Sequence, residues 1–157
     1  MQKITTFLWF DDQAEEAANY YVSIFRNSKI LGTSHYGDGM PRPKGSVLVV
    51  DFELDGQRFM ALNGGPSFKF TEAISLMVNC ETQPEIDEMW EKLSTGGEKS
   101  QCGWLKDKYG LWWQVVPTVL SQMLEGKDSE KANRVMKEVM QMNKLDTKRM
   151  QQAYDQD

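Results

Sequence analysis

The sequence is poor in the side chains that build most catalytic and metal centres. Its 157 residues include one histidine and two cysteines. A single imidazole, His35, cannot form a two-histidine metal site, and no Ser-His-Asp or Cys-His arrangement can be assembled without it. On a predicted strand beside a loop, His35 fits a surface or packing role. Cys80 and Cys102 form neither a Cys-x-x-Cys pair nor a disulfide framework, as is usual in a reducing compartment.

Long apolar runs and an excess of basic residues are also missing. Hydrophobic residues make up 40% of the chain, but no apolar stretch approaches the length of a membrane span. The 18 basic residues are scattered among 23 acidic ones, for a net charge of −5. We therefore expect neither nucleic acid nor a membrane as a partner. The start, Met1 to Ile4, shows no signal-peptide pattern, so a cytoplasmic location is expected. The length of 157 residues suits a single domain.

The most informative stretch that the sequence does contain is Cys102 to Pro117. It reads as a strand, a polar turn through Asp107 to Gly110, and a returning strand of aromatic and β-branched residues. Alternation along the returning strand predicts Trp112 and Gln114 on one face and Trp113 on the other. The Gln114 amide is therefore expected to lie on the same face of the sheet as the Trp112 ring.

Hydrophobic periodicity predicts the order strand, helix, strand, strand, strand in the first part of the chain. Asp55-Gly56 is a strong hairpin signal between the last two of these strands. The helical pattern begins near Asp11-Asp12 and ends before Asn27-Ser28. The expected strands are Ile4–Phe10, Lys29–Tyr36, Ser46–Leu54 and Gln57–Asn63.

The same order then starts again. A strand over residues 73–78 and a helix over 84–93 precede a strand into Cys102 and the hairpin already described. After Pro117 come three helical segments, over 119–124, 129–142 and 146–154, with methionines on their apolar side. We therefore predict an α+β fold of two βαβββ units with a C-terminal helical extension.

These residues resemble a known family. The pattern Asp107-x-Tyr109-Gly110-x-x-x-Gln114 resembles the closing hairpin of the vicinal oxygen chelate superfamily, which includes glyoxalases, extradiol dioxygenases and bleomycin- and fosfomycin-resistance proteins. The segments 102–107, 113–117 and 61–70 are similar to its PhnB-like branch, which carries a demethylubiquinone methyltransferase name. Segments 131–136 and 142–146 resemble the C-terminal extension of that branch.

The resemblance implies a domain organisation and an assembly. A domain over residues 1–118, with units 1–66 and 67–118, would curve into a mixed sheet enclosing a cleft, the glyoxalase/bleomycin-resistance fold. Residues 119–157 would form the extension. A homodimer is also implied, because relatives cover exposed sheet edges and faces by pairing subunits.

The resemblance also indicates where a metal ion would bind in this superfamily. The superfamily takes metal ligands from the first and last strands of each unit, and Thr5, Ala73 and Gln114 fall at three of those places. The fourth place lies near Ala61 or Asn63. Hydroxyl, methyl and amide groups do not suit a divalent transition metal, which prefers imidazole, thiolate or carboxylate. We therefore expect no metal and no cofactor.

A methyltransferase would normally need a doubly wound sheet with a glycine-rich loop after its first strand. Gly64-Gly65-Pro66 follows a predicted strand, but no helical pattern opens after it and no G-x-G spacing is present. The residues therefore give the methyltransferase name no support.

The remaining candidates would line a cleft with aromatic walls and a few polar points. The expected wall residues are Trp9, Trp104 and Trp112, with Phe59 and Trp113 as further candidates. The expected hydrogen-bonding residues are Thr5, Asn63, Ser75 and Gln114. Core packing is the alternative for every aromatic residue.

Lys69 is the one charged candidate, because with Gly64-Gly65-Pro66 it could face an anionic ligand. The alternative for this loop is a plain connection between the units. The function predicted from all these residues is that of a metal-free, small-molecule-binding homodimer. The alternative is an enzyme on a small metabolite, either metal-dependent or a methyltransferase.

Overall fold

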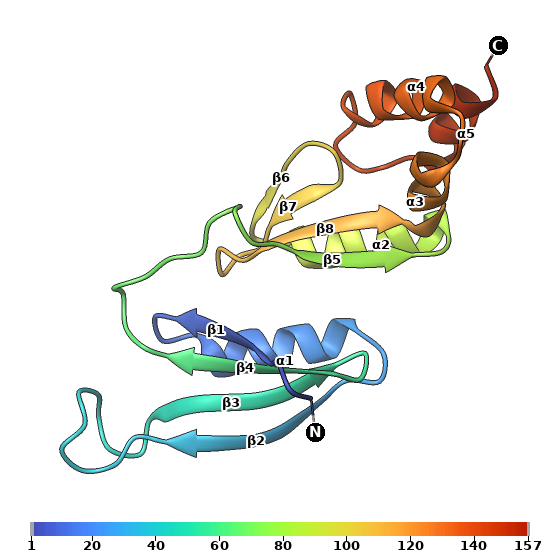
Figure 1. Ribbon diagram of the computed structural model, residues 1–157. Coiled ribbons are helices and arrows are strands. Elements are labelled where there is room, and N and C mark those ends of the chain that lie inside the picture. The colour runs from blue at the N-terminus through green and yellow to red at the C-terminus, as the bar shows by residue number, and fades with distance from the viewer. Residues whose placement is uncertain (1, 157) are drawn as a thin grey trace. The chain divides into compact units, whose positions relative to one another are not determined.

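The computed structural model describes residues 2–156 and divides into two compact units. The first unit runs to Phe70 and the second begins at Thr71. Each contains one βαβββ motif with a four-stranded mixed sheet, so the predicted α+β fold is confirmed (Figure 1). The division into a domain of residues 1–118 and a separate extension stays a prediction.

The first unit has a mixed sheet covered on one face by a helix (Figure 1). Strand β1 runs parallel to β4, while β3 pairs antiparallel with β4 and β2. Helix α1 packs closely on β3 and β4 through alanines that have no exposed surface. The elements are β1 (Thr6–Phe10), α1 (Ala14–Ile24), β2 (Lys29–His35), β3 (Val47–Leu54) and β4 (Gln57–Asn63).

The β3–β4 connection forms as its sequence predicts. Asp55 and Gly56 both adopt positive φ, 48° and 78°, which is the backbone of the tight two-residue hairpin. This turn fixes the register, in which Leu54 pairs with Gln57 and Phe52 with Phe59. Both phenylalanines therefore lie on the face that α1 covers.

The second unit repeats the arrangement. Strand β5 runs parallel to β8, which pairs antiparallel with β7. Strand β5 begins three residues later than predicted, because the Thr71 hydroxyl accepts from the Ala73 N–H at 3.3 Å and holds that stretch in a turn. The elements are β5 (Leu76–Cys80), α2 (Gln83–Ser94), β6 (Glu98–Lys99), β7 (Trp104–Lys106) and β8 (Trp112–Pro117).

Asp107 organises the β7–β8 hairpin. Its carboxylate is 1% exposed and accepts from the backbone N–H of Tyr109 and of Leu111. The second carboxylate oxygen accepts from the indole N–H of Trp113 at 2.8 Å. A buried carboxylate supplied with several donors fixes the turn and the first core residue of the returning strand.

The extension folds onto the second unit as three helices: α3 (Thr118–Glu125), α4 (Ser129–Val139) and α5 (Thr147–Asp155). Asp128 and Asp146 cap α4 and α5 by accepting from backbone N–H groups of the first turn. The methionine-rich face is covered by the extension itself and by the end of β8. That core contains Val116, Leu120, Met123, Val135, Val139, Met142, Leu145 and Met150. Among residues 2–156, no helix combines the length and apolar character needed to cross a membrane.

Candidate ligand-binding site

The second sheet has one face against α2 and one face turned away from it. Leu105, Trp113 and Val115 lie on the α2 side and are each at most 3% exposed. Trp112 and Gln114 alternate with them along β8 and are only half-buried. The predicted alternation therefore matches the structure, and the amide lies on the same face as the indole.

Four of the predicted site residues come together on this open face. The Gln114 side-chain N–H donates to the Ser75 hydroxyl at 2.9 Å. Trp104 pairs with Gln114 across the β7–β8 ladder, and its ring meets that of Trp112 edge-on, with centroids 6.5 Å apart. Met77 pairs with Gln114 from the β5 side and is 52% exposed. These five residues form what we call the aromatic face.

Sequence reasoning missed Met77 and Lys106 as neighbours of this site. The Lys106 ammonium lies 6.0 Å from the centroid of the Trp112 ring, within cation–π range, and 3.4 Å from a carboxylate oxygen of Glu98. Met77 could have been found from strand alternation, because it lies two residues after Ser75 within the predicted strand.

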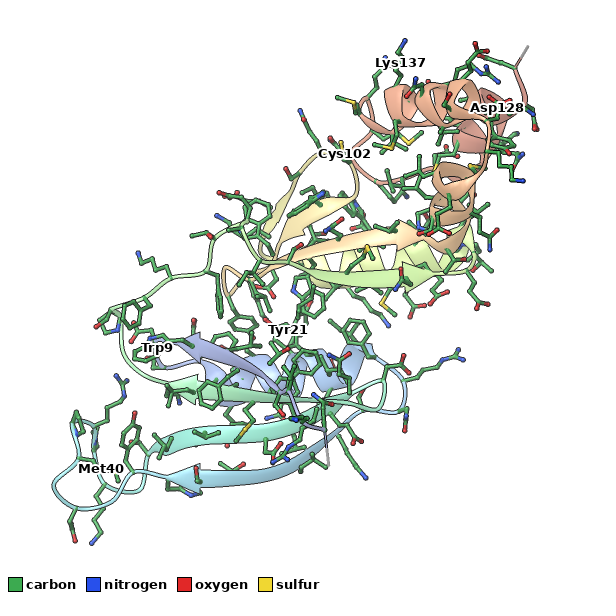
Figure 2. All side chains as sticks on the ribbon, in the orientation of Figure 1. Trp9, Tyr21, Met40, Cys102, Asp128 and Lys137 are labelled. Atoms are coloured by element: carbon green, nitrogen blue, oxygen red, sulfur yellow. The ribbon has the colours of Figure 1, made fainter. Side chains whose placement is uncertain are left out.

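In the first unit, Thr5 lies directly before β1 and Trp9 near the end of this strand. The Trp9 indole N–H donates to the Gly65 carbonyl at 2.9 Å, and the Phe68 ring meets it edge-on at 4.8 Å. A Cβ atom on Gly64 would lie only 2.4 Å from the indole. The loop after β4 therefore holds Trp9 in place. In Figure 2, the labelled Trp9 lies beside this loop.

Three of the other candidates lie away from an open sheet face. The Asn63 amide oxygen accepts from the Ala14 N–H at 2.8 Å, and its amide N–H donates to the Val47 carbonyl at 3.1 Å, so it closes the start of α1. Phe59 and Trp113, named as possible wall residues, are buried on the helix sides of their sheets, because their strand positions alternate with the open ones. Lys69 is exposed in the loop after β4.

In the structure, a different residue of the second unit occupies the place equivalent to Thr5, where the superfamily carries a metal ligand. Thr5 directly precedes β1, and Ser75, not Ala73, directly precedes the equivalent strand β5. Thr5, Ser75 and Gln114 offer two hydroxyls and an amide, which do not fit a divalent transition metal. Across residues 2–156, no three His, Cys, Asp or Glu side chains gather in a way that could hold a metal ion.

The Gly64-Gly65-Pro66 loop does not fit a nucleotide-type cofactor either. A turn and irregular chain follow it, so the glycines do not open a helix as they do in dinucleotide-binding loops. The Trp9 ring fills the space beside Gly64. The Gly64-Gly65-Pro66 loop thus does not fit the methyl-donor cofactor that the methyltransferase name implies.

Cys80 is not an activated nucleophile. Cys80 is fully buried, and this burial, assisted by the nearby Glu85 carboxylate, raises the pKa of its thiol to about 12. A thiol with that pKa stays protonated at neutral pH and is a poor nucleophile. Cys102 lies half-buried in the turn before β7.

Comparison with known proteins identifies the family. Residues 2–116 match the 3-demethylubiquinone-9 3-methyltransferase family model. The chain belongs to this family. A PhnB protein from Bacillus cereus, provisionally named a 3-demethylubiquinone-9 3-methyltransferase, is 42% identical, with 74% of this chain and 100% of that chain covered and a TM-score of 0.69. The comparison with curated proteins found no match.

More distant solved structures share the fold of this PhnB-like chain. A protein from Pseudomonas aeruginosa is 18% identical, with a TM-score of 0.62 over 74% of this chain and 98% of that chain. The fosfomycin-resistance protein FosX from Listeria monocytogenes, solved with Mn(II) and sulfate, is 16% identical, with a TM-score of 0.55 over 80% and 98% of the two chains. The PhnB-like chain therefore has the same fold as these proteins, the glyoxalase/bleomycin-resistance fold.

Proposed function

We propose that this PhnB-like protein binds a small, neutral aromatic molecule on the aromatic face and does not transform it. The observation that carries the proposal is the Gln114–Ser75 hydrogen bond beside the edge-on pair Trp104 and Trp112. Indole rings offer broad apolar contact, and a few polar groups between them fix the orientation of a ligand.

The polar pair also indicates the chemistry of the ligand. Once Gln114 has donated to Ser75, the pair can still offer an amide oxygen as acceptor and a hydroxyl or amide hydrogen as donor. Neither side chain carries a charge. An anionic ligand would have to compete with Glu98 for the Lys106 ammonium. A planar molecule with a donor and an acceptor on neighbouring atoms therefore suits this face.

The alternative is catalysis, which the family name favours in the form of methyl transfer. Amides and hydroxyls orient ligands but are poor proton-transfer groups, so Gln114 and Ser75 support binding better than general acid–base chemistry. Native mass spectrometry with elemental analysis tests the metal-dependent form of the alternative. One stoichiometric transition metal per chain would contradict our assignment of Thr5, Ser75 and Gln114.

The binding proposal predicts a ranking of simple probes. We expect 2-quinolone, a neutral bicyclic lactam with adjacent N–H and carbonyl, to bind more tightly than quinoline, which lacks that pair. Gln114→Leu should weaken 2-quinolone binding about fivefold, the effect of losing one neutral hydrogen bond worth about 1 kcal/mol. Binding of quinoline should change little. Isothermal titration calorimetry measures all of these affinities.

Gln122→Leu is the matched control, because Gln122 lies exposed on α3 and the same substitution there should leave both affinities unchanged. If 2-quinolone and quinoline bound equally to the unmodified protein, the donor–acceptor reading of Gln114 and Ser75 would be wrong. Tighter binding of 2-naphthoate than of 2-quinolone would show that the site takes anions.

We also propose that the protein is a homodimer. Strands β1 and β5 are edges of their sheets, and apolar side chains near them are half-exposed or more, including Phe7 and Met77. Such edges and faces are usually covered in natural proteins. Light scattering coupled to size-exclusion chromatography should give about twice the mass of one chain at micromolar concentration. A mass equal to one chain at the highest concentration tested would refute this assembly.

A further inference from the structure

The turn that leads into Trp104 has an unusual backbone. Cys102 and Gly103 both adopt positive φ, 61° and 82°, and the Trp104 N–H donates to the Gln101 carbonyl at 3.0 Å. These are the features of a type I′ turn. A side chain at positive φ is disfavoured for an L-residue, so Cys102 needs support from outside the turn.

That support comes from the connection between α4 and α5. The Cys102 N–H donates to the Met142 carbonyl, and the Gly103 N–H donates to the Asn143 carbonyl, each at 2.7 Å. Two successive N–H groups at positive φ form a concavity that attracts oxygen atoms. The carbonyls of the extension fill this concavity. In Figure 2, the labelled Cys102 lies on the side of the helical extension.

The connection is in turn tied to the start of α2. The Gln83 amide N–H donates to the Leu145 carbonyl at 3.0 Å, and its amide oxygen accepts from the Thr147 N–H at 2.8 Å. Lys144 pairs with Asp87 at 2.9 Å. The hydrogen bond from Gln83 and the nearby Lys144 ammonium lower the pKa of the Asp87 carboxyl. One glutamine side chain therefore anchors the connection at two points, and the ion pair adds a third.

The held turn lies next to the aromatic face. Trp104 follows Gly103 directly, and the Gly103 carbonyl accepts from the N–H of Val115, the neighbour of Gln114, at 2.8 Å. We propose that residues 142–147 act as a strap that positions Trp104 and Gln114 for the ligand, with Gln83 as its anchor. The effect on affinity rests on the proposed binding function, whereas the effect on Trp104 does not.

The test removes the anchor of the strap at Gln83, which lies outside the aromatic face. In Gln83→Ala, we expect amide hydrogen exchange of Cys102 and Gly103 to accelerate tenfold or more, because the carbonyls that hold them lose their anchor. The Trp104 indole NMR signal should shift or broaden while the Trp9 signal stays unchanged. The affinity for 2-quinolone should fall about fivefold. Gln122→Ala on α3 is the matched control and should change none of these quantities.

A second variant covers the possibility that Gln83→Ala does not fold. Lys144→Ala removes only the ion pair with Asp87 and keeps both hydrogen bonds from Gln83 to the connection. It should show the same changes in weaker form. Faster exchange at Cys102 and Gly103 with an unmoved Trp104 signal would overturn the strap proposal. If the unmodified protein bound no probe, the proposed binding function would be wrong. The Trp104 signal would still test whether the strap positions Trp104.

Discussion

Replacing Asp107 with alanine is expected to lower the free energy of unfolding of the second unit by about 3 to 5 kcal/mol. The buried carboxylate accepts from Tyr109, Leu111 and the Trp113 indole, and alanine would leave these buried donors without their acceptor. Urea titration followed by far-ultraviolet circular dichroism measures the loss. Tryptophan emission should shift as well, since the Trp113 N–H loses its partner.

Asp38→Ala is the matched control for that experiment. Asp38 is an exposed loop aspartate that forms an ion pair with Lys44 at 3.2 Å. Such exposed pairs contribute little to stability, so its loss should cost less than about 0.5 kcal/mol. A loss below about 1 kcal/mol for Asp107→Ala would mean that water replaces the carboxylate, and that the hairpin does not depend on it.

The second large effect is expected for Gly103→Ala, at about 3 kcal/mol or more. Positive φ contributes about 1 to 2 kcal/mol of this cost for any residue with a side chain. The remainder is steric, because the new Cβ would lie 2.8 Å from the Val115 carbonyl oxygen and 3.1 Å from the Leu145 side chain. Thermal and urea denaturation of the purified variant measure the total.

Gly110→Ala separates the two contributions. Gly110 has a similar φ of 90°, but among the described residues no atom beyond its two chain neighbours lies within 4 Å of the position its Cβ would take. It should therefore lose only the roughly 1 to 2 kcal/mol of backbone cost. Equal losses for the two variants would show that the close approach of Val115 and Leu145 relaxes freely, which would also weaken the strap proposal.

The parts of the fold that the sequence predicted well are those decided within a few residues. Asp55-Gly56 fixes a hairpin through backbone preferences of two adjacent residues, and β3 and β4 then begin and end within one residue of prediction. Alternation along β8 likewise placed Trp112 and Gln114 on one face. Such signals are local, so no knowledge of distant contacts is needed to interpret them.

The parts that escaped prediction depend on partners far along the chain. Asn63 reads as a polar residue at a strand end, but its partner is the Ala14 N–H, 49 residues earlier. Gln83 lies just before the helix predicted over 84–93, yet its partners Leu145 and Thr147 lie 62 and 64 residues later. Hydrogen bonds of this kind leave no periodic trace in a sequence.

The two repeated helices begin in different ways, and this difference has a kinetic consequence. Helix α2 is capped by Thr82, whose hydroxyl accepts from an N–H only three residues later, so its start can form as soon as that segment turns. The start of α1 is completed by Asn63, and a long loop must close before that bond exists. Closing such a loop costs chain entropy before any contact repays it. We therefore expect the start of α1 to be completed only after β4 has joined the sheet, whereas the start of α2 needs no distant partner.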